Sequence, residues 1–181
     1  MVKEPRAGLV KTRLGREIGM SAAAWWFRHQ SLALLRRVAD RRWDIRLAVT
    51  PDREGMASRF WPAHLPRLPQ GGGDLGARMA RLLRPARGPV VLIGADIPAA
   101  GRGQVARALA ALRGHDAVFG PAEDGGFWLV GLRRGAIAPR GLFQGVRWSG
   151  EHALSDSLAT ARGLRVALVD RLRDVDRAAD L

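Results

Sequence analysis

The aspartate at position 96 has the sequence context of a metal ligand. It follows the apolar run Val90–Ile93, which has the length and composition of a buried strand, and Gly94 ends that run. Mg²⁺ takes one or two carboxylates and completes its shell with phosphate oxygens and water. Asp96 is therefore a candidate metal ligand and catalytic residue, with capping of the next helix as the alternative.

A second group of carboxylates, Asp174, Asp176 and Asp180, lies near the C-terminal end. A carboxylate of this group could be a second ligand of a metal ion bound to Asp96. Two alternatives stay open. The group could cap a short helix, or it could pair with neighbouring arginines in a protein rich in positive charge.

The segment Pro5–Leu14 combines one glycine, Gly8, with two spaced cations, Lys11 and Arg13, ahead of a helical pattern. Glycine lets the backbone approach a ligand, and the two cations could neutralise a diphosphate. The second glycine and the Gly-Lys-Thr order of a P-loop are missing. An ordinary basic loop is the alternative.

A glycine run enters a helical pattern at Gln70–Met79, with Asp74 as its expected N-cap. Free amides at a helix start can cradle a phosphate, a ribose or a base. So many glycines are costly to order, which favours a ligand over a mobile loop that merely ends in a cap.

Two acids, Glu123 and Asp124, precede a glycine pair, Gly125 and Gly126, at the start of another apolar run. A carboxylate pair in this context suits base catalysis or recognition of sugar hydroxyls. An Asp-Gly hairpin turn explains the segment equally well.

Other catalytic chemistries find no support in the sequence. The four histidines have neither HExxH nor close paired spacing, so a zinc site is not expected. There is no Gly-x-Ser-x-Gly elbow for serine hydrolysis, and the absence of cysteine excludes disulfides and thiolate sites.

The elements that must position these residues alternate in kind. Short apolar runs predict strands at Ile45–Val49, Val90–Ile93, Ala117–Phe119, Phe127–Leu132 and Leu164–Val169. Helical periodicity covers residues 21–40, with Ser21 as a plausible N-cap, and recurs near 74–84, 101–113 and 151–161. This order predicts an α/β fold, a three-layer sandwich with a mainly parallel central sheet, whose ligands bind at the carboxyl ends of the strands.

The 181 residues suit one globular domain, 1–181, with 30 basic against 17 acidic residues and a net charge of +13. Such charge suits nucleic acid or phosphate substrates, but the cations are dispersed, and 28 of the 30 are arginine. The row Arg78, Arg81, Arg84 and Arg87 is more typical of a solvated helix face than of a binding ridge. With no apolar run long enough to cross a bilayer and no secretory signal pattern, we expect a cytoplasmic protein.

Six segments together resemble, in order and spacing, a bacterial glycosyltransferase-like family of the nucleotide-diphospho-sugar transferase superfamily, which has the GT-A fold. They are Pro5–Leu14, Gln70–Met79, Gly94–Pro98, Gly120–Phe127, Trp148–Ser149 and Asp174–Asp176. The family's first loop follows a full hydrophobic strand, whereas only Met1 and Val2 precede Lys3 here, so we expect the sequence to begin inside that strand.

The resemblance implies roles for individual residues. Those implied to bind the nucleotide are Gly8, Lys11, Arg13, Gln70, Gly71, Asp74, Leu75 and Gly76. Asp96 and Asp176 would hold Mg²⁺ or Mn²⁺, while Glu123 and Asp124 would join Asp96 in catalysis. The residues implied to border the acceptor are Gly125, Gly126 and Trp148.

The function so implied is a magnesium-dependent transferase that moves a group from a nucleotide or nucleotide-sugar donor to a small-molecule acceptor, with glycosyl transfer favoured. Many GT-A glycosyltransferases carry Asp-x-Asp at the metal strand, where this sequence has Gly94-Ala95-Asp96. Guanylyltransferase-like nucleotidyl transfer to a small phosphorylated acceptor is therefore the alternative. A non-catalytic basic module that binds nucleic acid or regulates is a further alternative, and nucleic acid is the less favoured ligand.

Overall fold

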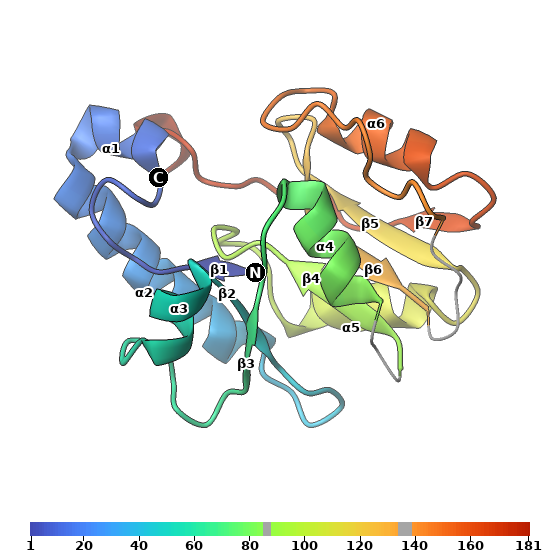
Figure 1. The fold of residues 1–181 in the computed structure, drawn as a ribbon, viewed down its shortest axis with the longest axis horizontal. Coiled ribbons are helices and arrows are strands. Elements are labelled where there is room, and N and C mark those ends of the chain that lie inside the picture. The colour runs from blue at the N-terminus through green and yellow to red at the C-terminus, as the bar shows by residue number, and fades with distance from the viewer. Residues whose placement is uncertain (85–87, 134–138) are drawn as a thin grey trace. The chain divides into compact units, whose positions relative to one another are not determined.

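The computed structural model describes residues 1–84, 88–133 and 139–181 (Figure 1). These residues divide into two compact units, each assembled from separate stretches of chain. The first unit consists of Met1–Gly71, Gly94–Arg102 and Asp174–Leu181, and the second of Gly72–Ile93 and Gly103–Arg173. A single domain over residues 1–181 stays a prediction.

The first unit contains a parallel sheet in the order β1-β2-β3. Its strands are β1 (Val2–Lys3), β2 (Leu47–Thr50) and β3 (Arg67–Pro69). Its helices are α1 (Thr12–Ile18), α2 (Met20–Val38), α3 (Asp52–Ala57) and the 3-10 helix η1 (Ala178–Asp180). Neighbouring parallel strands place their carboxyl ends at one edge, which is where the segments after β1 and β2 begin.

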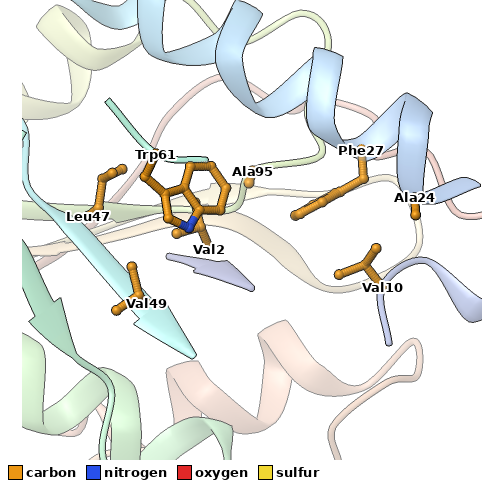
Figure 2. Close-up of a cluster of buried hydrophobic side chains, with 8 residues drawn as sticks. All are labelled: Val2, Val10, Ala24, Phe27, Leu47, Val49, Trp61 and Ala95. Carbon is orange, nitrogen blue, oxygen red and sulfur yellow. The ribbon is translucent and has the colours of Figure 1, made fainter. Parts of the chain in front are cut away.

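An apolar cluster holds the first unit together (Figure 2). Phe27 and Ala24 of α2 lie near Val10, while Trp61 lies over the strand residues Leu47 and Val49. Each of these side chains is less than one tenth exposed. Burial of this kind stabilises by about 25 cal/mol per Å² of apolar surface, so this cluster fixes α2 and the loop before α1 on the sheet.

The second unit contains a mixed sheet in the order β4-β6-β5-β7. Its strands are β4 (Val90–Ile93), β5 (Ala117–Pro121), β6 (Phe127–Leu132) and β7 (Val166–Leu168). Its helices are α4 (Leu75–Leu83), α6 (Ala153–Thr160) and most of α5 (Arg102–Ala111). Strand β6 runs antiparallel to β4 and β5 because the chain reverses in a hairpin after β5, while β5 and β7 are parallel.

The α/β class predicted from periodicity is confirmed, with differences at individual elements. The predicted strand Ile45–Val49 begins at Leu47 and pairs with β1 and β3, two short strands that the apolar pattern did not predict. Ser21 is not an N-cap, because α2 begins at Met20 after Gly19. Helices α1 and α3 were also not predicted, since seven and six residues carry too few apolar repeats.

Within the described part of the chain, every helix is too short or too polar to cross a lipid bilayer.

Candidate functional site

Three carboxylates converge in the first unit. Asp96, Asp174 and Asp176 each offer an oxygen atom, and these three atoms lie within 4.8 Å of one another. Lys11 binds two of them, with Nζ 2.5 Å from Asp96 Oδ2 and 2.7 Å from Asp176 Oδ1. Arg13 donates to the other oxygen of Asp176 at 2.9 Å. The proximity of Asp176 to Asp96, 80 positions apart in the sequence, is therefore confirmed.

Each segment that carries these charges is anchored by a buried apolar neighbour. Val10 and Leu14 bracket Lys11 and Arg13, and they are 4% and 0% exposed. Val175, between the two C-terminal aspartates, packs with Leu14, and its backbone N–H donates to the carbonyl of Asp96 at 3.2 Å. The alternation of buried apolar and charged residues thus brings three distant segments together with their charges on one side.

Asp174 joins this cluster although the sequence argument gave it no metal role. Its signal is the Asp-x-Asp spacing of Asp174 and Asp176, since two side chains separated by one residue in a non-helical segment often point the same way. The intervening Val175 is 2% exposed, so its burial directs both carboxylates away from the core.

Arg37 of α2 is another residue that the sequence argument did not single out. Its Nε donates to the carbonyl of Ala100 at 3.0 Å, and its NH2 group lies 3.4 Å from the carbonyl of Ile97. These bonds hold the segment that follows Asp96. Arg37 lies in the basic end of α2, where the sequence offered no way to distinguish it from its exposed neighbours.

The backbone at Lys11 adopts an unusual conformation. Lys11 has φ 44° and ψ 48°, the left-handed region, at the N-cap of α1. For a residue with a side chain this costs on the order of 1 kcal/mol or more, and such strain is found preferentially at functional sites. Gly8, three residues earlier, has φ 76° at no comparable cost.

Electrostatic coupling perturbs both partners of the central ion pair. Burial by itself would lower the pKa of Lys11, but the charge of Asp96 and the hydrogen bonds with both carboxylates outweigh it, so this pKa is raised above its ordinary value. Burial would raise the pKa of Asp176, but the hydrogen bond and charge of Lys11, together with Arg13, lower it overall. Lys11 is therefore an ammonium ion and Asp176 a carboxylate at neutral pH.

The donor set fits a hard divalent cation. Mg²⁺ binds oxygen at about 2.1 Å, so two ligand atoms on opposite sides of one ion are ~4.2 Å apart. The three carboxylate oxygens lie within 4.8 Å of one another, so small side-chain rotations would bring one pair to that separation and the third oxygen to an adjacent position. Lys11 binds oxygens of two of the same carboxylates and would have to release them.

Gln70 and Gly71 follow β3, where the sequence predicted contacts to the nucleotide. The Gln70 side chain is buried, and its Nε2 donates to the carbonyls of Val2 and Ala48. The N–H of Gly71 donates to both carboxylate oxygens of Asp52 at 3.1 Å. The Gln70 amide thus joins backbone segments of the sheet and the Gly71 amide binds an acid, and the predicted contact of either residue with a nucleotide stays a prediction.

Asp74 caps α4 as predicted, since its carboxylate accepts the N–H of Ala77 at 2.8 Å. Leu75 is 45% exposed at the start of the helix. Gly76 is buried, and a Cβ there would lie 2.7 Å from Cβ of Phe143 and 2.9 Å from the Trp148 ring. A packing requirement therefore explains this glycine, and its predicted contact with a nucleotide stays a prediction.

The segment Ala122–Gly126 forms the hairpin between β5 and β6, the alternative that the sequence left open. Asp124 Oδ1 accepts the N–H of Gly126 at 2.9 Å, and Gly125 has φ 86°. A Cβ on Gly125 would lie 2.5 Å from Cα of Glu151, so only glycine fits. Both acids are exposed. The Asp124 carboxylate stabilises the turn through its hydrogen bond with the N–H of Gly126.

Trp148 belongs to an aromatic cluster of the second unit. Its ring centroid lies 6.2 Å from those of Phe127 and Phe143. Its Nε1 is buried and has no hydrogen-bond partner among the described residues. The acceptor contact predicted for Trp148 stays a prediction.

The chain is similar to known bacterial proteins in sequence and in fold. Residues 33–150 match the model of a family described as "Uncharacterized protein conserved in bacteria (DUF2064)". A solved structure from Desulfovibrio desulfuricans G20, provisionally named a nucleotide-diphospho-sugar transferase, is 33% identical with a TM-score of 0.83. The match covers 97% of this chain and 80% of that one. The predicted fold is thereby confirmed.

Two further solved structures share the fold alone. A homologue of Mycobacterium tuberculosis rv0371c from Mycobacterium sp. strain JC1 is 17% identical with a TM-score of 0.54, covering 85% of this chain and 78% of that one. The 4-diphosphocytidyl-2C-methyl-D-erythritol synthase from Anaerococcus prevotii DSM 20548 is 13% identical with a TM-score of 0.56, covering 85% and 84%. No curated protein matches the chain.

Proposed function

This chain belongs to the bacterial DUF2064 family and has the nucleotide-diphospho-sugar transferase fold, and on that basis we propose that it is a magnesium-dependent transferase with a nucleotide-sugar donor. The observation that carries the proposal is the cluster of Asp96, Asp174 and Asp176 against Lys11 and Arg13. Carboxylates and cations alternate there within direct contact distance, as binding of a metal and a diphosphate together requires.

In the proposed mechanism, Asp96 and Asp176 would hold the ion, and Asp174 would offer a third oxygen. The ion would supply Lewis-acid polarisation of phosphoryl oxygens and charge neutralisation of a diphosphate leaving group. Lys11 and Arg13 would contribute further positive charge toward the phosphates. The catalytic role predicted for Glu123 and Asp124, which lie in the second unit, stays a prediction.

Binding can be tested by thermal shift with nucleoside diphosphates, triphosphates and nucleotide sugars, each with and without Mg²⁺. A ligand that binds only the folded protein at a hundredfold its Kd adds about 2.7 kcal/mol to the stability. We expect a rise in Tm that needs both nucleotide and metal, and its loss in Asp96→Asn. The matched control is Asp44→Asn, an exposed carboxylate of the same unit. A panel in which no nucleotide raises Tm with Mg²⁺ contradicts the proposal.

Nucleotidyl transfer is the second candidate, and a specific observation favours it. The strand-end motif Gly94-Ala95-Asp96 offers one carboxylate, and its neighbours Asp174 and Asp176 come from the C-terminal segment instead of an Asp-x-Asp at the strand. Phosphorus NMR of the products separates the reactions. Glycosyl transfer releases a nucleoside phosphate from a nucleotide sugar, whereas nucleotidyl transfer releases pyrophosphate from a nucleoside triphosphate.

A further inference from the structure

The second unit contains an open pocket of about 920 Å³, between α4 and the segment that includes Arg140 and Leu142. Three arginines line it, Arg81, Arg84 and Arg140, together with the apolar side chains of Ala77, Ala80 and Leu142. Its volume is in the range of small-molecule sites, and it combines an apolar surface with a few charged groups, as such sites commonly do.

The charge of the pocket is strongly unbalanced. Asp74 is the acidic residue of its lining, and that carboxylate already accepts the N–H of Ala77 at the start of α4. Arg81 donates to the carbonyl of Gly72 at 3.0 Å. Across residues 1–84, 88–133 and 139–181, no carboxylate lies within ion-pair distance of Arg84 or Arg140. A dianion would satisfy both guanidinium groups, whose planar donors match phosphate oxygens.

The wall opposite α4 is held in a fixed conformation. Phe143 has φ 68°, a left-handed backbone that is costly for an aromatic residue. Its N–H donates to Oγ1 of Thr160 at 2.9 Å, and Thr160 in turn donates to the carbonyl of Ser157 at 2.7 Å. Gly76 lets α4 approach Phe143 so closely that a Cβ would clash. A wall that is already in place does not have to be ordered when a ligand binds.

We propose that this pocket binds a small phosphate monoester with an apolar body. The phosphate pairs with Arg84 and Arg140, and the apolar part contacts Ala77, Ala80 and Leu142. The sequence pattern indicated that the helical row of arginines forms a solvated face. Two residues of that row, Arg81 and Arg84, line the pocket. Arg87 of the same row lies outside the described residues.

The test is calorimetric titration with phenyl phosphate, inorganic phosphate and phenol. We expect phenyl phosphate to bind more tightly than either fragment, and Arg84→Gln or Arg140→Gln to weaken it by roughly tenfold or more, as the loss of a charge-assisted hydrogen bond implies. Arg113→Gln removes an equal charge from an exposed position of the same unit and should change the affinity less than about twofold. Equal losses in all three variants, or no binding of phenyl phosphate at millimolar concentration, would overturn the proposal.

A second variant tests the pocket without altering its charge. Ala77 is exposed at the rim, so Ala77→Phe should cover part of the apolar wall and weaken binding of phenyl phosphate while the Tm of the free protein changes little. Unaltered binding in this variant places the ligand elsewhere and refutes the site.

The phosphate could also belong to a nucleotide, and competition distinguishes the two sources. If the pocket is a separate site, the affinity for a nucleotide with Mg²⁺ stays unchanged in Arg84→Gln and Arg140→Gln, and phenyl phosphate does not displace the nucleotide. Displacement, together with a tenfold loss of nucleotide affinity in both variants, would show that the pocket holds donor phosphates and would overturn a separate site. Failure of every nucleotide to bind would affect only the proposed transferase function.

Discussion

At the scale of single residues, Lys11 is the group that decides how the carboxylate cluster behaves. Its ammonium binds Asp96 and Asp176, two of the oxygen donors that a metal ion would use. Lys11 therefore competes with a cation in the free protein and assists a diphosphate in the complex. Removal of the ammonium should therefore strengthen binding of a cation to the free protein and weaken binding of a diphosphate, so a single substitution can distinguish the two roles.

We predict that Lys11→Met tightens binding of Mn²⁺ to the free protein while it weakens binding of a nucleotide with metal. The gain should be of the order of tenfold, since one nearby charge shifts a proton equilibrium by roughly one to three pK units. Electron paramagnetic resonance of Mn²⁺ measures the first effect and calorimetry the second. Lys3→Met is the matched control, because Lys3 is exposed. Weaker Mn²⁺ binding in Lys11→Met would show that the lysine does not compete for the carboxylates.

At the scale of elements, the packing of α3 on β2 depends on a glycine. A Cβ on Gly55 would lie 2.6 Å from Cβ of Val49, which is fully buried. We predict that Gly55→Ala destabilises the protein by about 1–3 kcal/mol, because overpacking outweighs the better helix propensity of alanine. Chemical denaturation measures this change.

Gly103 in α5 is the matched control for that substitution. A Cβ there would meet only the end of the Arg107 side chain, at 3.5 Å. Gly103→Ala should therefore be neutral or stabilise by up to about 1 kcal/mol. Equal effects of the two substitutions would mean that the contact between α3 and β2 relaxes freely.

The sheet of the second unit is joined by Asp116, which lies just before β5. Its carboxylate accepts from Arg165 and Arg133, the residues that flank β7 and β6. The hydrogen bond from the Arg165 side chain, then that from its backbone, lowers the pKa of Asp116 to about 2, with a smaller contribution from the charge of Arg133. Protonation therefore weakens a contact between two strands.

The sign of the resulting pH dependence follows from this depressed pKa. Asp116 stabilises the fold fully above the unfolded value of 3.8, and the contribution is lost as the pH falls toward 2. We predict that Asp116→Asn lowers Tm at pH 7 and that its difference from the wild type shrinks between pH 4 and pH 2. Calorimetry across this range is the measurement. A difference that is independent of pH would mean that the amide retains the contacts and that charge contributes nothing.

At the scale of the whole molecule, several of the 30 basic residues are already engaged in internal contacts. Arg107 pairs with Asp170, Arg147 with Asp156 and Arg177 with Glu17. Arg67 donates instead to backbone carbonyls. Charge spread over such contacts does not form the continuous stripe that polyanion binding uses.

Salt dependence tests this interpretation. A protein that contacts six to ten phosphates loses about 10³ to 10⁵ in affinity between 50 and 200 mM salt. We predict that binding of a nucleotide with Mg²⁺ weakens less than about tenfold over that range, because a diphosphate engages few cations. Titrations at both salt concentrations with a nucleotide and with a DNA duplex provide the comparison. A steep slope with tight duplex binding would favour the nucleic-acid alternative.

The sequence by itself determined the α/β class and most of the longer elements. These follow from local patterns, because apolar runs and helical periodicity report which face of an element is buried. The proximity of Asp96 to Asp176 was implied by the family resemblance of the six segments, since strand ends of such folds gather ligands. Only the tertiary structure decided that Asp174 lies beside Asp96 and Asp176, and that Lys11 binds two carboxylates. It also decided the internal hydrogen bonds of Gln70 and Gly71 and the pocket lined by arginines. The physical reason is that a side chain's partner is set by distances between segments far apart in the chain, and no local pattern encodes such a distance.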